Sequence, residues 1–161
     1  MMGSGKSAVG QMLADRTGKP FLDTDILIED EAGLAVFEVF EEEGEARFRL
    51  REAEAIQTAA GIADAVVATG GGAVLVDHNV RLMKASGPVV WLQAEPATLA
   101  ARIGDVPGRP LLIGVDVKNR LSIILGERQA AYAGAADHVV PTDDASVEEV
   151  AMKVEEIWNA S

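Results

Sequence analysis

The first residues of the chain have the types and spacing of a phosphate-binding loop. They match the second half of the pattern G-x-x-x-x-G-K-[ST], with Gly3, Ser4, Gly5, Lys6 and Ser7. Glycines let backbone N–H groups turn toward phosphate oxygens, and the N-terminus of a following helix points at them. Lys6 can reach the β- and γ-phosphates, and the Ser7 hydroxyl can bind Mg²⁺. The segment predicts binding of a nucleoside triphosphate; the alternative is a Gly/Ser-rich tail before a helix.

The loop pattern is incomplete at its start. Its first glycine, and the strand that should precede it, would fall before Met1. The expectation from the sequence is therefore that a first strand is missing, and that the chain is a truncated or wrongly started version of a working enzyme.

A second set of polar residues follows the strand expected at Phe21 and Leu22. Asp23 and Asp25 lie at its carboxyl end, which is where ligands bind in open α/β sheets. One carboxylate can hold the water shell of a metal while the other contacts a substrate hydroxyl. The alternative is that the Asp-Thr-Asp segment is a helix N-cap, supplied by Thr24 or Asp25.

Several arginines can supply the positive pocket that an anionic substrate needs. Arg49 has Glu52 one helical turn away, so that a carboxylate can hold the guanidinium in place. Three further candidates are Arg102, Arg109 and Arg128. The alternative for each is a solvated charge on a helix face.

Three consecutive glycines, Gly70, Gly71 and Gly72, follow the buried strand expected at 65–69. Without β-carbons, this backbone can approach a ligand closely. The alternative is a plain tight turn, which rarely needs three glycines.

The composition restricts the class of protein. The chain has 161 residues, a net charge of −12, no cysteine and 48% hydrophobic residues. These values suit one compact domain and exclude disulfides and thiolate chemistry. A surface this acidic disfavours nucleic acid and anionic membranes. No apolar run has the length of a membrane span, and no signal peptide is expected.

Helical and strand patterns alternate along most of the chain, which predicts a parallel sheet covered on both faces. Expected helices are 4–17, 26–32, 36–42, 45–60, 79–85, 97–103, 118–132 and 146–158; expected strands are 21–22, 65–69, 88–92 and 138–140. The region 26–60 departs from the alternation with helix after helix and predicts a small subdomain. The stretch 104–114 is rich in Gly and Pro and predicts a loop.

Taken together, these residues resemble the shikimate kinase family, which are small P-loop kinases of the nucleoside-monophosphate-kinase type. The resemblance rests on blocks in the same order and spacing: Gly3–Ser7, Leu22–Asp25 with Ile28 and Glu29, Phe40, Gly44–Glu45, Phe48–Arg49 with Glu52, Gly70–Val74, Arg109–Leu112, and Glu127–Arg128 with Tyr132. It implies an α/β three-layer sandwich with a parallel sheet whose first, central strand is missing from this chain. It further implies one kinase domain over 1–161, with a substrate-binding helical subdomain near 26–60 and a lid near 104–116.

The resemblance also implies an activity: transfer of the γ-phosphoryl of ATP to the 3-hydroxyl of shikimate, in the route to chorismate and aromatic amino acids. It implies catalytic roles for Lys6, Asp25 and Arg109, and Mg²⁺ binding through Ser7 and Asp23. Nucleotide-binding positions are Gly3, Ser4, Gly5, Lys6, Ser7, Ala8, Arg102 and Arg109. Shikimate-binding positions are Asp25, Arg49, Gly70, Gly71, Gly72 and Arg128.

The expected enzyme is a cytoplasmic monomer that uses ATP and shikimate and binds neither nucleic acid nor membrane. Two rival interpretations are another small-molecule P-loop kinase, such as a gluconate kinase, and a non-catalytic nucleotide-binding module. Asp25, Arg49 and Arg128 argue against the first rival. Retention of Arg109 together with Asp25 and Arg49 argues against the second.

Overall fold

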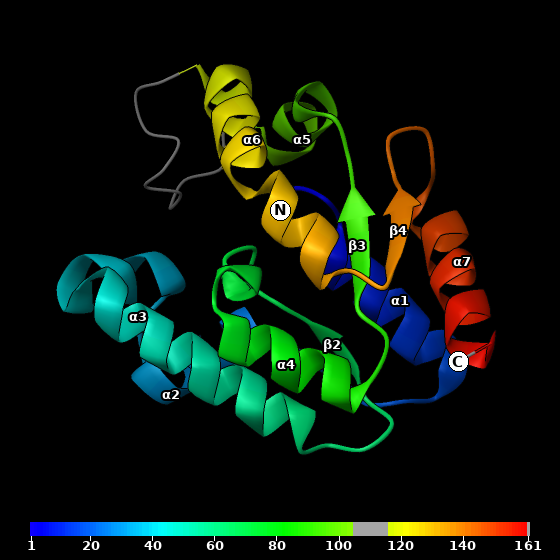
Figure 1. Cartoon of the computed structure of the whole chain (residues 1–161), viewed down its shortest axis with the longest axis horizontal. Coiled ribbons are helices and arrows are strands. Elements are labelled where there is room, and N and C mark those ends of the chain that lie inside the picture. Colours follow the sequence, from blue (N-terminus) through cyan, green and yellow to red (C-terminus); the bar gives the residue numbers. More distant parts are fainter. Residues whose placement is uncertain (105–115, 161) are drawn as a thin grey trace.

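The structure, a computed structural model, describes residues 1–104 and 116–160 (Figure 1). The helices are α1 (Lys6–Thr17), α2 (Thr24–Ala32), α3 (Val36–Ala60), the short 3₁₀ helix η1 (Ala73–Leu75), α4 (Asp77–Ser86), α5 (Pro96–Ile103), α6 (Val117–Ala135) and α7 (Val147–Ala160). The strands are β1 (Phe21–Asp23), β2 (Val66–Ala68), β3 (Val90–Gln93) and β4 (His138–Pro141). Every helix and strand expected from the sequence is present with slightly shifted ends, and η1 is the one addition within the described ranges. The expected loop at 104–114 and lid at 104–116 fall almost entirely outside them.

The strands form two parallel pairs, β1 with β2 and β3 with β4. Parallel pairing confirms the expectation from the alternating pattern. Among the described residues, hydrogen bonding does not continue from β2 to β3. A cavity of about 380 Å³ lies there, and its lining includes Val66 and Val67 of β2 and Val90 of β3. Within the described residues, the two strand pairs lie on either side of this cavity, and α1 packs against both, with Val9 and Leu13 in a core that includes Val66 and Leu92.

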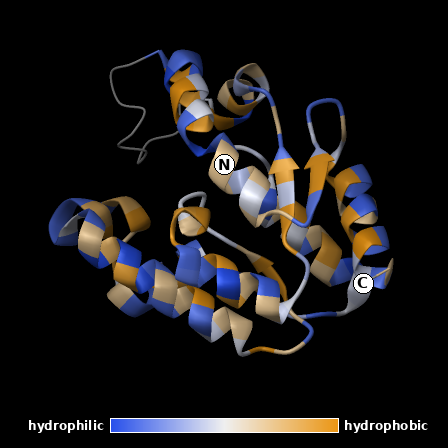
Figure 2. Cartoon of the chain, in the orientation of Figure 1, coloured by the Kyte–Doolittle hydropathy of each residue, from blue (hydrophilic) through white to orange (hydrophobic). Residues whose placement is uncertain are grey.

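Alternation along β3 builds a helix–sheet–helix arrangement. Trp91 is buried with residues of α5 and α6, while its neighbour Leu92 is buried with residues of α1 and α7. Successive side chains of a strand point to opposite faces, so each face of β3 is covered by its own pair of helices. Hydrophobic residues predominate along β3 and β4, as expected for covered strands, whereas α3 and α4 have hydrophilic outer surfaces (Figure 2).

Helices α2 and α3 form a layer with a core of their own. α3 is interrupted at Gly44, whose φ of 78° and ψ of 169° are not helical. This break confirms the two separate helices expected at 36–42 and 45–60. Four buried residues form the core of the layer: Ile28, Val39, Phe48 and Ala55. The core fixes the face of α3 that carries Arg49 and Glu52.

Two isoleucines on α2 test the contribution of this core. Ile28 is 0% exposed and Ile26 is 51% exposed. Ile28→Ala is expected to lower the free energy of unfolding by about 3 kcal/mol, because it removes buried apolar volume from a closed site. Ile26→Ala is the matched control and should change stability by less than about 0.5 kcal/mol. Urea denaturation of both variants measures the difference; equal effects would contradict the assignment of the core.

Candidate functional site

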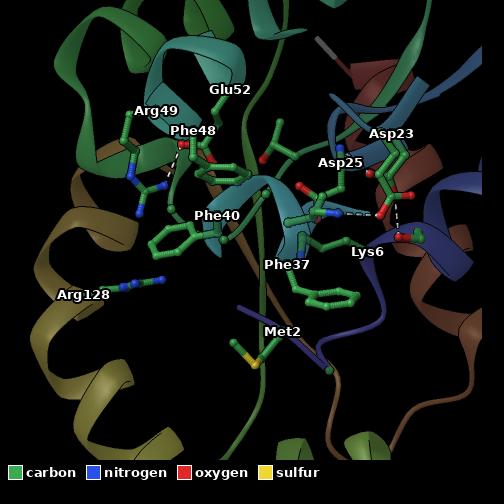
Figure 3. Close-up of a pocket in the computed structure, with 18 of the residues that line it drawn as sticks. Met2, Lys6, Asp23, Asp25, Phe37, Phe40, Phe48, Arg49, Glu52 and Arg128 are labelled. Carbon is green, nitrogen blue, oxygen red and sulfur yellow. Dashed lines mark hydrogen bonds and ion pairs between the residues drawn. The ribbon is translucent and has the colours of Figure 1, made fainter. Parts of the chain in front are cut away.

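A cavity of about 510 Å³ lies where the start of α1 meets the ends of β1 and β2 (Figure 3). It is lined by Met2, Gly3, Gly5, Lys6, Ser7, Ala8, Asp23, Asp25, Glu29, Val36, Phe37, Phe40, Phe48, Arg49, Glu52, Thr69, Gly70, Gly71, Gly72 and Arg128. The structure therefore brings together most residues that the sequence marked as candidates. Ser4 and Arg102 lie outside this lining, and Arg109 lies outside the described residues.

The loop before α1 has the backbone form of an anion site. Gly5 has a φ of 89° and is the N-cap of α1 without a side-chain hydrogen bond to the first turn. Gly3 has a φ of 75°, and a β-carbon there would lie 2.9 Å from Ile103 Cγ1. Lys6 Nζ donates a 2.7 Å hydrogen bond to the Met1 carbonyl, and Ser4 Oγ donates to the same oxygen. Ser4 therefore shapes the loop from inside, whereas Lys6 lines the cavity.

Ser7 and Asp23 lie in direct contact. Ser7 Oγ donates a 2.6 Å hydrogen bond to Asp23 Oδ2, and the Asp25 N–H donates to Asp23 Oδ1 at 3.0 Å. Asp23 is therefore the N-cap of α2, which corrects the alternative that Thr24 or Asp25 supplies the cap. Within the described ranges, no group of three or more His, Cys, Asp or Glu is arranged to hold a metal. A hydroxyl beside one carboxylate fits Mg²⁺, which takes few protein ligands when substrate phosphates supply the others.

Among the described residues, Asp25 is the cavity carboxylate whose oxygens have no hydrogen-bonding partner. Burial, followed by the nearby charge of Asp23, raises its pKa to about 6. Lys6 opposes this shift, and Glu52 adds to it. No hydrogen bond to its carboxylate oxygens occurs among the described residues. A carboxylate that is half-buried and uncommitted can accept a proton from a bound hydroxyl at neutral pH.

Arg49 is held in place by α3 itself. Its Nη1 donates to Glu52 Oε2 at 2.8 Å, and Glu52 is 1% exposed. Its Nη2 donates to Glu45 Oε1 at 3.3 Å. Its guanidinium carbon lies 5.5 Å from the centre of the Phe48 ring. The expectation that Glu52 orients Arg49 is confirmed, and a buried carboxylate fixes the guanidinium for contact with an anion.

The three glycines pass between these charged side chains. A β-carbon at Gly70 would lie 2.8 Å from Glu52 Oε1 and 3.0 Å from Asp25 Oδ1, and one at Gly72 would collide with the guanidinium of Arg49. The Gly70 N–H donates to Thr24 Oγ1 at 3.0 Å. The segment is therefore a turn against which charged side chains pack closely. A side chain at position 70 would displace Glu52 and Asp25, and one at position 72 would displace Arg49.

The remaining arginines are placed differently from one another. Arg128, on α6, lines the cavity and points toward it on the same side as Arg49 (Figure 3). It forms no ion pair within the described part of the chain. Arg102, at the end of α5, donates to Thr142 Oγ1 at 2.9 Å and also to the Thr142 carbonyl. The contact joins α5 to the loop after β4.

Sequence reasoning missed part of the cavity wall. Phe37, Phe40 and Phe48 line it from α3, although only Phe40 and Phe48 belonged to a recognised block. It considered Thr24 only as a possible helix cap and assigned no role to Tyr132, although the hydroxyls of both bond to the backbone of the glycine loop at Gly70 and Gly71. Tyr132 belonged to a recognised block, but its spacing gave no signal for the contact with Gly71, which is 61 positions away.

The fold and the cavity define the class of the protein. A glycine loop enters α1 beside a parallel strand pair, and the cavity has a Lys–Ser end and a two-arginine end, with Asp25 between them (Figure 3). This is the arrangement of a small-molecule P-loop kinase. The shikimate kinase family model matches residues 2–158, and the chain belongs to this family. It is an ATP-dependent kinase that phosphorylates shikimate in aromatic amino-acid biosynthesis.

Known relatives agree with this assignment over almost the whole chain. The chain is 46% identical to a shikimate kinase of Symbiobacterium thermophilum over 97% of its length and 91% of the relative. It is 43% identical to one of Moorella thermoacetica, over 99% of the chain and 91% of the relative. Among solved structures, the Acinetobacter baumannii shikimate kinase in complex with shikimate superposes with a TM-score of 0.94, at 32% identity, over 99% of this chain and 89% of that one. No helix among the described residues is long and apolar enough to cross a membrane.

The raised pKa of Asp25 predicts a pH-dependent stability. The pKa is 3.8 for an ordinary Asp and about 6 here, so between these values the folded state binds more protons than the unfolded chain. Stability therefore falls as the pH rises through this window. Asp25→Asn should make the metal-free, nucleotide-free protein more stable by about 2 kcal/mol above pH 6. The difference should vanish below about pH 3, where the parent carboxyl is protonated in both states.

Thermal or urea unfolding in EDTA across this pH range measures the effect. Asp30→Asn is the matched control, because Asp30 is exposed on the same helix, and it should leave the pH profile unchanged. A constant difference between Asp25→Asn and the parent at every pH would contradict the raised pKa.

Proposed function

We propose that the two ends of the cavity bind the two substrates, with the γ-phosphate of ATP at Lys6 and Ser7 and the carboxylate of shikimate at Arg49 and Arg128. The observation that carries the proposal is that one cavity contains both groups, with Asp25 between them.

At the nucleotide end, the loop at Gly3 and Gly5 and the start of α1 offer N–H groups to phosphate oxygens. Lys6 adds a positive charge at the β- and γ-phosphates. Ser7 and Asp23 would hold Mg²⁺, Ser7 directly and Asp23 through water. The metal supplies neutralisation of the negative charge on the phosphates when it is bound.

At the acceptor end, shikimate presents one carboxylate and three hydroxyls. Arg49, oriented by Glu52, and Arg128, which has no competing ion pair within the described chain, form a suitable pair for the carboxylate. Asp25 would contact the hydroxyls, accept the proton of the 3-hydroxyl on a carboxylate oxygen and so favour attack on the γ-phosphorus. The ring would lie against the backbone at Gly70–Gly72 and the aromatic wall of α3.

Two roles rest on the family resemblance. Arg109, in the expected lid, would stabilise the charge of the transferred phosphoryl group. Arg102 would lie near the adenine; its bonds to Thr142 fix the position of its guanidinium beside the loop after β4. Closure of the lid would bring Arg109 in and exclude water.

Replacing Arg49 tests the acceptor end. Arg49→Ala should raise the KM for shikimate by about 100-fold, because it removes a charge-assisted contact, and should leave the KM for ATP within about twofold of the parent. Steady-state kinetics with each substrate varied in turn measures both values. Arg47→Ala is the control, since Arg47 is 57% exposed and pairs only loosely with Glu43. An equal loss for both substrates would sink the assignment.

Replacing Lys6 tests the nucleotide end. Lys6→Ala should lower kcat by at least about 100-fold, because the cation that meets the developing charge is gone, while circular dichroism shows an intact fold. Lys84→Ala, which removes an exposed lysine paired with Asp137, serves as control. Undiminished turnover in Lys6→Ala would rule out the phosphate role. Retained ATP binding without any shikimate-dependent turnover in the parent would instead favour a non-catalytic module.

A further inference from the structure

Tyr132 connects the helix of one substrate arginine to the glycine loop. It lies on α6, four residues after Arg128, and is 5% exposed. Its hydroxyl donates a 2.7 Å hydrogen bond to the Gly71 carbonyl. Its ring stacks on Trp91 of β3 with ring centres 5.4 Å apart and planes inclined by 23°. The residue therefore touches the core on one side and the cavity wall on the other.

Every peptide unit around Gly71 is fixed by a hydrogen bond. The Gly70 N–H donates to Thr24 Oγ1, and the Gly70 carbonyl accepts from the Ala73 N–H at 3.2 Å. The Gly71 carbonyl accepts from Tyr132. Within the described chain, the Gly71 N–H has no acceptor of its own, and Gly71 lines the cavity. These bonds therefore set the direction of a backbone donor that is open to a ligand oxygen.

The same hydroxyl also sets the position of Arg128. Residues four apart lie on one face of a helix, one above the other. The contact from Tyr132 to Gly71 therefore fixes how far the Arg128 face of α6 lies from the glycine loop. Glycines lack the side-chain contacts that would otherwise hold such a loop, so its backbone conformation depends on hydrogen bonds of this kind.

We propose that Tyr132 is a positioning residue for shikimate: its hydroxyl holds the Gly71 peptide and the Arg128 helix at the spacing that the substrate requires. The proposal rests on the substrate site described under Proposed function. The residue does not touch the reacting atoms; it acts through Gly71 and Arg128. Its hydroxyl also lies 3.7 Å from Met1 Sδ, but Ser4 and Lys6 of the nucleotide loop bind the Met1 carbonyl and not its sulfur. The larger effect of losing the hydroxyl must therefore fall on shikimate.

Tyr132→Phe tests the proposal, because it keeps the stacked ring and removes the hydroxyl, which bonds to the Gly71 carbonyl and also contacts Arg128 and Met1 Sδ. The KM and Kd for shikimate should rise about tenfold, the factor that one lost hydrogen bond accounts for. The Kd for ATP should stay within about twofold. Trp91→Phe is the packing control: it disturbs the ring that stacks on Tyr132 but leaves the hydroxyl–carbonyl bond, so it should lower the melting temperature without changing shikimate affinity.

A second measurement covers the case of a variant that does not fold. Tyr132 is the chain's one tyrosine, so 3-fluorotyrosine places a single ¹⁹F reporter in otherwise unaltered protein. Shikimate should shift this resonance, and ATP alone should leave it nearly unchanged. Unchanged shikimate affinity in folded Tyr132→Phe, equal losses for both substrates, or a resonance that ignores shikimate would each overturn the proposal.

Arg49→Ala, measured in parallel, distinguishes a failure of the proposed shikimate site from a failure of the positioning role of Tyr132. If Arg49→Ala weakens shikimate binding and Tyr132→Phe does not, the positioning role fails and the site stands. If both variants bind shikimate as tightly as the parent does, the substrate site itself is wrong, and the role of Tyr132 fails with it.

Discussion

Charged side chains from two helices occupy the space that β-carbons would fill along Gly70 and Gly72. Asp25 and Glu52 crowd the first glycine, and the guanidinium of Arg49 crowds the second. This close approach brings the carboxylate of Asp25, the guanidinium of Arg49 and the Gly71 N–H into one cavity. The positions of α2 and α3 depend on it, because both helices must present these side chains to the glycine loop.

The cavity contains four carboxylates in a chain of net charge −12, yet under the proposed function it binds two anionic substrates. The structure resolves this conflict by engaging three of the four. Asp23 accepts from Ser7, Glu29 accepts from the Val36 N–H at 2.9 Å, and Glu52 accepts from Arg49. Only Asp25 keeps its oxygens uncommitted among the described residues, and burial raises its pKa. An uncommitted carboxylate with a raised pKa is suited to proton transfer, whereas the engaged ones serve to orient their donors.

The sequence was sufficient to predict the elements and most of the cavity, because both depend on local patterns. Gly5-Lys6-Ser7 and the Asp23–Asp25 segment each lie at the end of an element, and ends of parallel strands meet at one edge of a sheet. The pairing of Arg49 with Glu52 follows from helical spacing alone.

Contacts between distant segments were not predictable in this way. The bond from Tyr132 to Gly71 spans 61 positions, and no periodicity in either segment indicates it. The alternative that Thr24 or Asp25 caps α2 was wrong in its residue, because Asp23 is the cap. Asp23 and Asp25 are both competent caps, and only the backbone geometry distinguishes them.

Long-range contacts join the elements that form the cavity. Arg49 and Asp25 lie on α3 and α2, which share a core, whereas Arg128 is on α6, which packs with β3. α1 contacts both strand pairs by apolar packing, since Val9 and Leu13 share a core with Val66 of β2 and Leu92 of β3. Packing of this kind is less directional than a hydrogen bond. The Tyr132–Gly71 bond is a directional contact between α6 and the glycine loop. Under the proposed function, this bond determines how closely Arg128 can approach Asp25 and Arg49.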